Sequence, residues 1–327
     1  MVISRAPVRI SFFGGGTDYP EHFLNEGGAV LATAIDKYSY VTASPFQSHL
    51  FDYSVRVSYR KVELVKRVEE IEHKVYKACL RICGLERDIE LHNVADLPAF
   101  TGLGSSSAFT VSLLQALHSF KGESPDRMAL AYEAIHVERQ VLKESVGCQD
   151  QVSSAVGGLN LIEFRREDDI LVHPAHLSAD RRSEFERHFL LVFTGITRKA
   201  ADIASAQVRK TDQNKALLLK MRKMVDLGWH MLTGSGTPAE FGSLLHEAWN
   251  AKKGLDAGIS NGHIDELYKT ALENGAWGGK LTGAGGGGFF LLVAPPEKHN
   301  QLKAALPDKY FLNIGINAPG VSVIFSS

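Results

Sequence analysis

A glycine-rich turn that leads directly into an apolar helical pattern constrains this chain more than any other stretch. Residues 97–120 read LPAFTGLGSSSAFTVSLLQALHSF. Gly102 and Gly104 can adopt backbone conformations closed to other residues, so a ligand can come close to the main chain. The helix predicted to begin at Ser105 has an apolar stripe that would anchor it: Ala108, Val111, Leu114, Ala116 and Leu117. An anchored helix N-terminus after such a turn predicts an anion site, although an ordinary capped turn also fits this segment.

Two familiar nucleotide motifs can be tested on a second glycine-rich segment, residues 278–288. The P-loop pattern G-x-x-x-x-G-K-[ST] is excluded, because Leu281 follows Lys280 and Asn274 stands where the first glycine belongs. The run GAGGGG matches G-x-G-x-x-G, but the following FFLLVA reads as a strand where a dinucleotide fingerprint needs a helix. Neither motif identifies the anion that residues 97–120 would hold.

Charge and composition restrict the classes of partner. The chain has 36 Lys and Arg residues against 37 Asp and Glu, so its net charge of −1 gives no global field that attracts nucleic acid. The sequence contains no long apolar run and no signal-peptide pattern at MVISRAPVRISFF, which predicts a cytoplasmic protein without a membrane partner. Three cysteines without a C-x-x-C pair argue against a disulfide framework and a structural zinc site. The pattern does not indicate the oligomeric state.

Strand and helix patterns alternate along the chain without a regular rhythm. The segments VRISFF, AVLATAID and YSYVTAS read as strands, and a long amphipathic helix is predicted to begin at Ser124 and Pro125. The absence of a repeated βαβ order favours an α+β fold. The charged tract RREDD interrupts the apolar pattern, which predicts two domains, residues 1–168 and 169–327.

Two acidic residues carry the strongest chemical signal. Glu138 falls on the apolar stripe of the helix predicted after Pro125, three residues from Ile135 and four from Leu142. A buried carboxylate needs a partner, which can be a cation, a hydrogen-bond network or a metal ion. Asp150 follows a glycine turn, where it can cap a helix. Close to a phosphate loop, the same carboxylate would be suited to accept a proton from a hydroxyl.

Three segments, in order, resemble the motifs of the GHMP kinases, a family of small-molecule kinases. PVRISFFGGGTDYP resembles the first motif, PAFTGLGSSSA the nucleotide-binding second motif, and KLTGAGGGGF the glycine-rich third. GCQDQ adds a fourth match at the expected separation. The resemblance implies an ATP- and Mg²⁺-dependent kinase that has a ribosomal-protein-like N-terminal domain, a ferredoxin-like C-terminal domain and an active site between them.

The resemblance also implies roles for individual residues. The ATP phosphates would be bound by Gly102, Leu103, Gly104, Ser105, Ser106 and Ser107. Ser106 and Glu138 would hold Mg²⁺. Asp150 would act as the catalytic base, and Arg9 would lie near the transferred phosphoryl group. The acceptor would be bound by Gly16, Thr17, Asp18, Tyr19, Gly283, Ala284, Gly285 and Gly286.

The acceptor itself is narrowed by local differences within the family. Galactokinases carry a Glu-His pair where this chain has Gly15 and Gly16, which argues against galactose. RISFFGGGTDYP, GGAVLATAIDKY and FTGITRKA resemble the D-glycero-D-manno-heptose 7-phosphate kinases, which implies phosphorylation of the anomeric hydroxyl in GDP-heptose and polysaccharide biosynthesis. The distal phosphate then needs a cationic site, for which Arg198 is preferred over Lys199 and Lys37. A kinase for an unphosphorylated sugar such as fucose and a non-catalytic nucleotide sensor are the alternatives.

Overall fold

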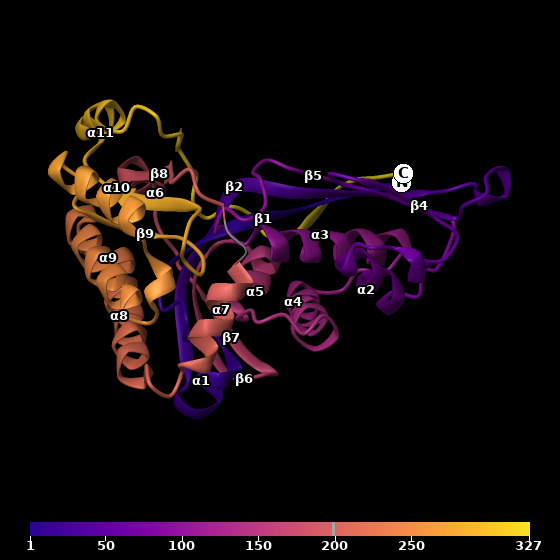
Figure 1. The fold of residues 1–327 in the computed structure, drawn as a ribbon, viewed down its shortest axis with the longest axis horizontal. Helices are drawn as coiled ribbons and strands as arrows, with labels where there is room; N and C mark the ends of the chain where they lie inside the picture. The colour runs from indigo at the N-terminus through magenta and orange to yellow at the C-terminus, as the bar shows by residue number, and fades with distance from the viewer. Residues whose placement is uncertain (198–199) are drawn as a thin grey trace.

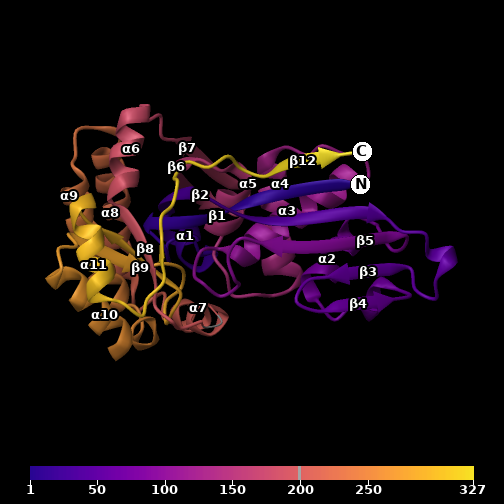
Figure 2. The same ribbon diagram turned by 90° about the horizontal axis from the view of Figure 1, so that it is seen from above.

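The computed structural model describes residues 1–197 and 200–327 and places helices against two β-sheets (Figures 1 and 2). The larger sheet contains eight strands within the described residues. They are β1 (Val2–Phe13), β2 (Gly28–Pro45), β3 (Val55–Ser58), β4 (Val62–Val65), β5 (Ile89–Ala95), β6 (Leu159–Arg166), β7 (Asp169–Pro174) and β12 (Ser322–Ser326). The strand order is β12-β1-β2-β5-β3-β4, and β6 pairs with both β2 and β7.

The long strand β2 pairs along one edge with two strands of the larger sheet, β5 and β6. Residues 39–45 pair with β5, whereas residues 28–33 pair with β6. Almost every pairing in this sheet is antiparallel; β3 and β5 run parallel. β12 pairs only with residues 2–5 of β1, and beyond them Arg9 N–H donates at 2.9 Å to Leu103 O in the loop that carries Gly102 and Gly104.

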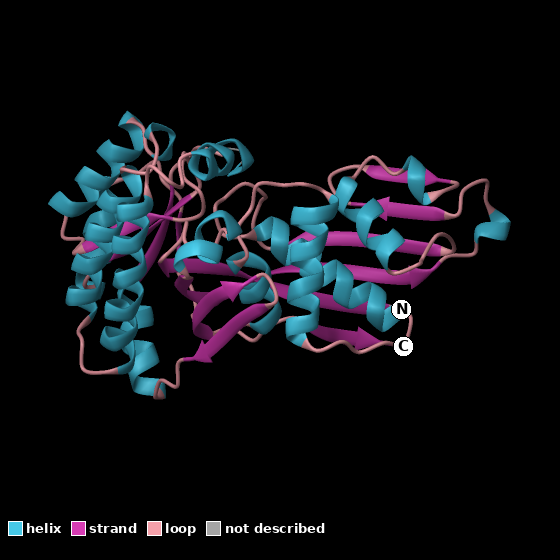
Figure 3. Cartoon of the chain, turned by 90° about the horizontal axis from the view of Figure 1, so that it is seen from below, coloured by secondary structure: helices cyan, strands magenta, loops and turns pink. Residues whose placement is uncertain are grey.

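Helices cover one face of the larger sheet (Figure 3). They are α2 (Lys74–Ile82), α3 (Ser105–Phe120), α4 (Arg127–Ile135), the π-helical turn η3 (His136–Val141) and α5 (Gln149–Val156). Short elements complete this part: α1 (Pro20–Glu26), η1 (Ser48–Leu50) and η2 (Val68–Glu70). The central helix α3 packs on β1 and β2 with its apolar stripe, and α2, α4 and α5 pack beside it. The anchored helix predicted after the glycine turn is therefore confirmed.

The helix predicted from Ser124 differs from the structure at both ends. Asp126 caps α4, because its carboxylate accepts a hydrogen bond from Ala129 N–H at 2.8 Å, so the prediction of a start at Ser124 is wrong. Regular α-helix stops at Ile135 and continues as the π-helical turn. A π-turn inside a helix shifts the faces of the residues that follow, and such turns are frequent at functional sites.

The smaller sheet contains four antiparallel strands within the described residues, in the order β11-β8-β10-β9. They are β8 (Phe189–Phe193), β9 (Gly278–Leu281), β10 (Phe289–Val293) and β11 (Phe311–Leu312). The accompanying helices are α6 (Ala179–His188), α7 (Ala200–Arg209), α8 (Lys215–Thr233), α9 (Pro238–Lys253), η4 (Ala257–Ile259), α10 (Gly262–Glu273), η5 (Pro296–Lys298) and α11 (His299–Ala305). The mixture of helices with largely antiparallel sheets confirms the α+β prediction.

The two sheets share part of their apolar core. Phe12 and Phe13 of β1 meet Phe241 of α9 at ring-centroid separations of 5.3 and 5.1 Å. The predicted division at residue 168 falls in the turn between β6 and β7, which pair with each other, and β12 returns from the C-terminus to pair with β1. The larger sheet thus takes strands from both sides of residue 168. No helix in the described residues has the length and apolar character needed to cross a membrane.

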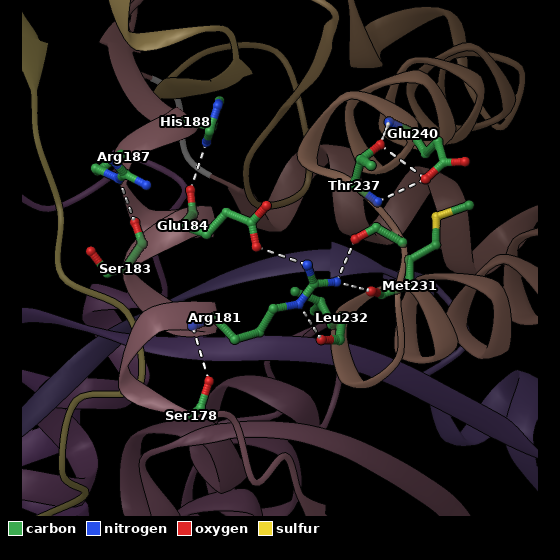
Figure 4. Close-up of polar contacts among 11 residues, drawn as sticks. Ser178, Arg181, Ser183, Glu184, Arg187, His188, Met231, Leu232, Thr237 and Glu240 are labelled. Atoms are coloured by element: carbon green, nitrogen blue, oxygen red, sulfur yellow. Dashed lines mark hydrogen bonds and ion pairs between the residues drawn. The ribbon is translucent and has the colours of Figure 1, made fainter.

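Arg181 of α6 fastens the end of α8 to the start of α9 (Figure 4). Its guanidinium donates to Met231 O at 2.6 Å and Leu232 O at 3.2 Å, and also to Gly236 O. Carbonyl groups in the last turn of a helix have no partner inside the helix, so the arginine satisfies groups that would otherwise be left unpaired. Next to it, Thr237 and Glu240 form a capping box that begins α9.

Candidate active site

A cavity of about 340 Å³ lies where the turn before α3, the loop before α1, the start of α5 and the end of α9 come together. Its polar lining includes Arg9, Asp18, Ser105, Ser106, Ser107, Glu138, Gln149, Asp150, Lys252 and Lys280. Acidic and basic side chains from segments far apart in the sequence therefore face one enclosed space. Clefts lined in this way are the usual position of a small-molecule site.

The turn before α3 presents its backbone to this cavity. Gly102 and Gly104 have φ angles of +81° and +73°, a region that side chains rarely adopt. A Cβ on Gly104 would lie 3.2 Å from Asp150 Oδ2, so this residue must be small for the turn to approach the acid. No described side chain caps the start of α3. The N–H groups of its first turn can therefore bind an anion, assisted by the helix dipole.

Glu138 is buried at the edge of the cavity with one oxygen unpartnered. Its Oε2 accepts hydrogen bonds from Ser107 Oγ at 2.8 Å and Gln151 Nε2 at 2.6 Å, whereas Oε1 has no partner among the described residues. Burial raises the pKa of Glu138 to about 7. The structure thus brings Ser107 rather than Ser106 into contact with this carboxylate. Ser106 is exposed and lines the cavity.

Arg9 and Asp150 form a two-pronged ion pair. Arg9 Nε lies 2.7 Å from Asp150 Oδ1 and Nη2 lies 2.7 Å from Oδ2, while Nη1 donates to Gly102 O at 2.8 Å. Asp150 is the second residue of α5, so it is not the helix cap that its sequence context allowed. Each carboxylate oxygen has two lone pairs, so Asp150 can still accept a hydrogen bond from a ligand hydroxyl. Arg9 thereby orients the acid and ties it to the glycine turn.

Asp18 also lines the cavity. Its Oδ1 accepts from Gly16 N–H at 2.9 Å and its Oδ2 from Gln149 N–H at 3.3 Å. Burial raises the pKa of this carboxyl, against the effect of the hydrogen bond from Gly16. Gly147 leaves the necessary space, since a Cβ there would lie 1.9 Å from Asp18 Oδ2. Asp150 and Asp18 therefore have different surroundings, because one is paired with a cation and the other is held by backbone N–H groups.

The other residues predicted for the substrate divide into two groups. Gly16, Tyr19, Gly283 and Ala284 line the cavity. Thr17, Gly285 and Gly286 do not line it and have roles in the backbone, and neither does Leu103, which was predicted for the ATP phosphates. For example, Thr17 Oγ1 donates to Gly14 O and Ala29 O, both at 2.8 Å, and Gly286 N–H donates to Ile259 O at 2.9 Å. Arg198 and Lys199 lie outside the described residues.

Two buried lysines belong to the cavity and were missed from the sequence. Lys252 is 4% exposed and Lys280 is 3% exposed. Lys252 ends the apolar stripe of α9 that includes Leu245, Ala248 and Trp249, a spacing that could have identified it. Lys280 lies in the fully buried four-residue strand β9, whose sequence GGKL contains no comparable signal. A lysine on a buried stripe predicts a partner, but it does not say which one.

Comparisons with known proteins agree with this arrangement. Residues 60–158 match the family model described as GHMP kinases N terminal domain, and residues 225–312 match GHMP kinases C terminal. The chain is 30% identical to the D-glycero-alpha-D-manno-heptose 7-phosphate kinase of Campylobacter jejuni, over 92% of each chain. It is 28% identical to the L-fucokinase/L-fucose-1-P guanylyltransferase of Bacteroides fragilis, over 87% of this chain and 34% of that protein. The crystal structure of a D-glycero-D-manno-heptose 1-phosphate kinase from Bacteroides thetaiotaomicron superposes with a TM-score of 0.80 at 24% identity, over 100% of each chain.

Proposed function

The chain belongs to the GHMP kinase family, and from this premise we propose that it phosphorylates the anomeric hydroxyl of D-glycero-D-manno-heptose 7-phosphate. The donor is ATP, as in GHMP kinases generally, and the product is the 1,7-bisphosphate, an intermediate on the way to GDP-heptose. The observation that carries the chemistry is the Arg9–Asp150 pair, which lies beside the uncapped start of α3 in one cavity.

The chain's own residues supply the elements of a direct transfer. The N–H groups at the start of α3 bind the phosphates, and Asp150 accepts a hydrogen bond from the acceptor hydroxyl. The acceptor oxygen forms a bond to the γ-phosphorus while the bond from that phosphorus to the β–γ bridging oxygen breaks, and ADP leaves. The hydroxyl proton passes to Asp150. Arg9 holds Asp150 in position and contributes positive charge beside the transferred group.

The residues present also fit Mg²⁺. Glu138 Oε1 is buried, unpartnered and next to the phosphate-binding turn, and a carboxylate oxygen is a preferred ligand of this ion. Ser106 and Glu138 would hold the ion, and Ser107 and Gln151 would orient the carboxylate. When bound, Mg²⁺ neutralises negative charge on the phosphates.

The lining of the cavity and the names of related proteins support the assignment of the acceptor. Gly15 and Gly16 line the cavity without a side chain, which is compatible with a larger sugar, and the Campylobacter jejuni relative acts on a heptose 7-phosphate by name. Arg198 is our candidate ligand for the distal phosphate, and that assignment rests on the sequence alone. Lys37, the weaker candidate, does not line the cavity and pairs with Asp36 at 3.1 Å.

An acceptor panel tests this proposal. ADP release is measured with D-glycero-D-manno-heptose 7-phosphate, the unphosphorylated heptose, L-fucose and mevalonate. We expect kcat/KM for the phosphorylated heptose to exceed that for the free sugar by at least about 100-fold, because a site built around a charged group rejects an analogue that lacks it. Arg198→Ala should remove this preference. A preference for L-fucose would instead support the alternative that the Bacteroides fragilis relative suggests.

A non-catalytic nucleotide sensor is the less favoured alternative. A sensor needs the phosphate-binding turn, but it has no use for a carboxylate oriented toward an acceptor by a buried arginine. Binding of ATP without turnover of any sugar in the panel would favour the sensor.

A further inference from the structure

Three buried basic side chains among the described residues line the cavity, those of Arg9, Lys252 and Lys280. They differ in how many of their N–H groups donate a hydrogen bond. Three nitrogens of Arg9 donate to Asp150 and Gly102. Lys280 Nζ donates to Ser11 O at 2.8 Å and Phe12 O at 3.1 Å, so it fastens β9 to β1. Lys252 Nζ donates to Gly283 O alone among the described residues. An ammonium group has three N–H donors, so two of those of Lys252 have no partner in the described part of the chain.

Lys252 lacks the carboxylate that a buried ammonium normally requires. It forms no ion pair within the described residues, and Asp18 and Asp150 act on it only at a distance while Arg9 repels it. Burial is the largest influence and lowers the pKa of Lys252 to about 8. Keeping a charge in such a place costs folding free energy unless an anion joins it. The N–H groups of Lys252 that have no partner in the described residues therefore point to an anionic ligand inside the cavity.

The hydrogen bond from the Lys252 ammonium to Gly283 O indicates where in the cavity that anion would lie. Gly283, whose carbonyl accepts from Lys252, packs directly on the phosphate-binding turn: a Cβ on Gly283 would lie 2.6 Å from Gly102 Cα. Gly102 O in turn accepts from Arg9, which holds Asp150. Lys252 thus lies at the junction of the phosphate-binding turn and the proposed base. The 7-phosphate of a heptose is at the opposite end of the sugar from the anomeric oxygen, so this junction is not its site.

We propose that Lys252 is a catalytic residue whose ammonium binds oxygen atoms of the phosphoryl group during its transfer from ATP to the acceptor hydroxyl. This inference rests on the proposed kinase function and adds a residue to it. Negative charge on the phosphoryl oxygens must be balanced while the bond to the leaving oxygen breaks and the bond to the acceptor oxygen forms. Lys252 enters the cavity from α9 and the phosphate-binding turn leads into α3, so residues from both halves of the chain would act on this group together.

Substitution of Lys252 gives the main test, and the next residue provides a matched control. Lys253 also lies on α9, but its side chain is 34% exposed and pairs with Asp265 at 3.4 Å. We expect Lys252→Met to lower kcat by about 100- to 1,000-fold, the usual range for loss of one preorganised charge donor, with KM for the acceptor changed less than about threefold. Lys253→Met should retain wild-type kinetics. Lys252→Arg should recover turnover to within about tenfold, because it restores the positive charge.

A second measurement separates this role from acceptor binding and from failure of the proposed function. Slow hydrolysis of Mg·ATP is measured without any sugar, so that water takes the place of the acceptor. Lys252→Met should reduce this hydrolysis in parallel with kcat, while binding of a non-hydrolysable ATP analogue stays unchanged. The inference is overturned if hydrolysis is unaffected while KM for the acceptor rises, or if Lys252→Met behaves like Lys253→Met. If no sugar in the panel is phosphorylated, the proposed acceptor is wrong, yet the hydrolysis result still decides the role of Lys252.

Discussion

Arg181 and Arg9 both connect distant parts of the chain, but their surroundings differ in how completely the polar groups are paired. Around Arg181 the guanidinium donates to the carbonyls of Met231 and Leu232 and to Glu184 (Figure 4). It also lies 4.6 Å from the ring of Phe185. No atom of this group is buried without a partner among the described residues. This network is complete without a ligand.

Around Arg9, by contrast, several buried polar atoms have no hydrogen-bond partner among the described residues. Buried atoms without a partner include Ser11 Oγ, Glu138 Oε1 and Gln149 Oε1, all on residues that line the cavity, and the ammonium of Lys252 lacks an anion. Unpaired buried groups cost stability, so a folded chain that keeps several of them in one place is explained by a ligand that pairs them. Changes around Arg9 should therefore affect turnover, and changes around Arg181 should affect stability.

The largest loss of turnover is expected from Asp150. Asp150→Ala should lower kcat by about 100- to 10,000-fold, the usual range for loss of a general base, with little change in ATP affinity. Asp150→Asn keeps the shape and should lose about as much, because an amide cannot take the proton. Steady-state kinetics and binding of a non-hydrolysable ATP analogue measure the two quantities. Turnover of either variant at the wild-type rate would contradict the assignment of Asp150 as base.

A substitution at Glu138 should lower turnover while it raises the free energy of unfolding. Glu138→Gln should lower kcat by about 100-fold through loss of the metal-binding charge. Burial raises the pKa of Glu138 from 4.5 to about 7, so the folded state loses stability as pH rises between these values. The metal-free variant should therefore gain about 1–3 kcal/mol at pH 8, measured by urea unfolding in EDTA. Glu266→Gln, on the exposed face of α10, is the control, and a destabilised Glu138→Gln would contradict the comparison.

The pH profile tests the charge on Lys252. Its proton is required for turnover, and burial lowers its pKa to about 8 in the free protein, so kcat/KM should fall about tenfold for each pH unit above that value. The ionisable groups that face it are Arg9, Asp18, Asp150 and Lys280. Lys252→Arg should abolish the alkaline decline up to about pH 10, because guanidinium stays protonated there. An unchanged alkaline limb in this variant would assign the decline to another group.

The smallest effect on turnover is expected at Arg181. Arg181→Ala leaves the carbonyls of Met231, Leu232 and Gly236 without this donor and should lower the free energy of unfolding by about 2–4 kcal/mol. Its kcat should stay within about twofold of wild type. Arg187→Ala on the same helix is the matched control, since that side chain is exposed and, within residues 1–197 and 200–327, donates only to Ser183 O. Loss of activity without loss of stability at Arg181 would contradict the division between the two networks.

The parts of the site that depend on local sequence were predictable. The turn at Gly102 and Gly104, the helix from Ser105 and the burial of Glu138 all follow from glycine positions and a 3.6-residue period, and the structure confirms them. Which serine contacts Glu138 depends on how α3 is rotated against η3. The π-helical turn at that point shifts the face on which Glu138 lies, and the resemblance, which implied Ser106 as a Mg²⁺ ligand, does not report this contact.

The parts that depend on contacts distant in sequence were not predictable in this way. Lys252 and Lys280 reach the cavity because α9 and β9 pack against β1, and no periodicity in one segment reports that contact. Similarly, β12 joins the larger sheet beside β1 although more than 300 residues separate the two strands. The GHMP motifs indicated the family because three segments far apart in the sequence occur in the order typical of that family.

The most direct test of the proposed function identifies the atom that receives the phosphoryl group. The protein is incubated with Mg·ATP and D-glycero-D-manno-heptose 7-phosphate, and the product is examined by ³¹P NMR. The account predicts two phosphate monoester signals of equal intensity, one of them coupled to the anomeric proton. A new phosphate coupled to any other proton, or the absence of product while L-fucose is phosphorylated, would contradict it.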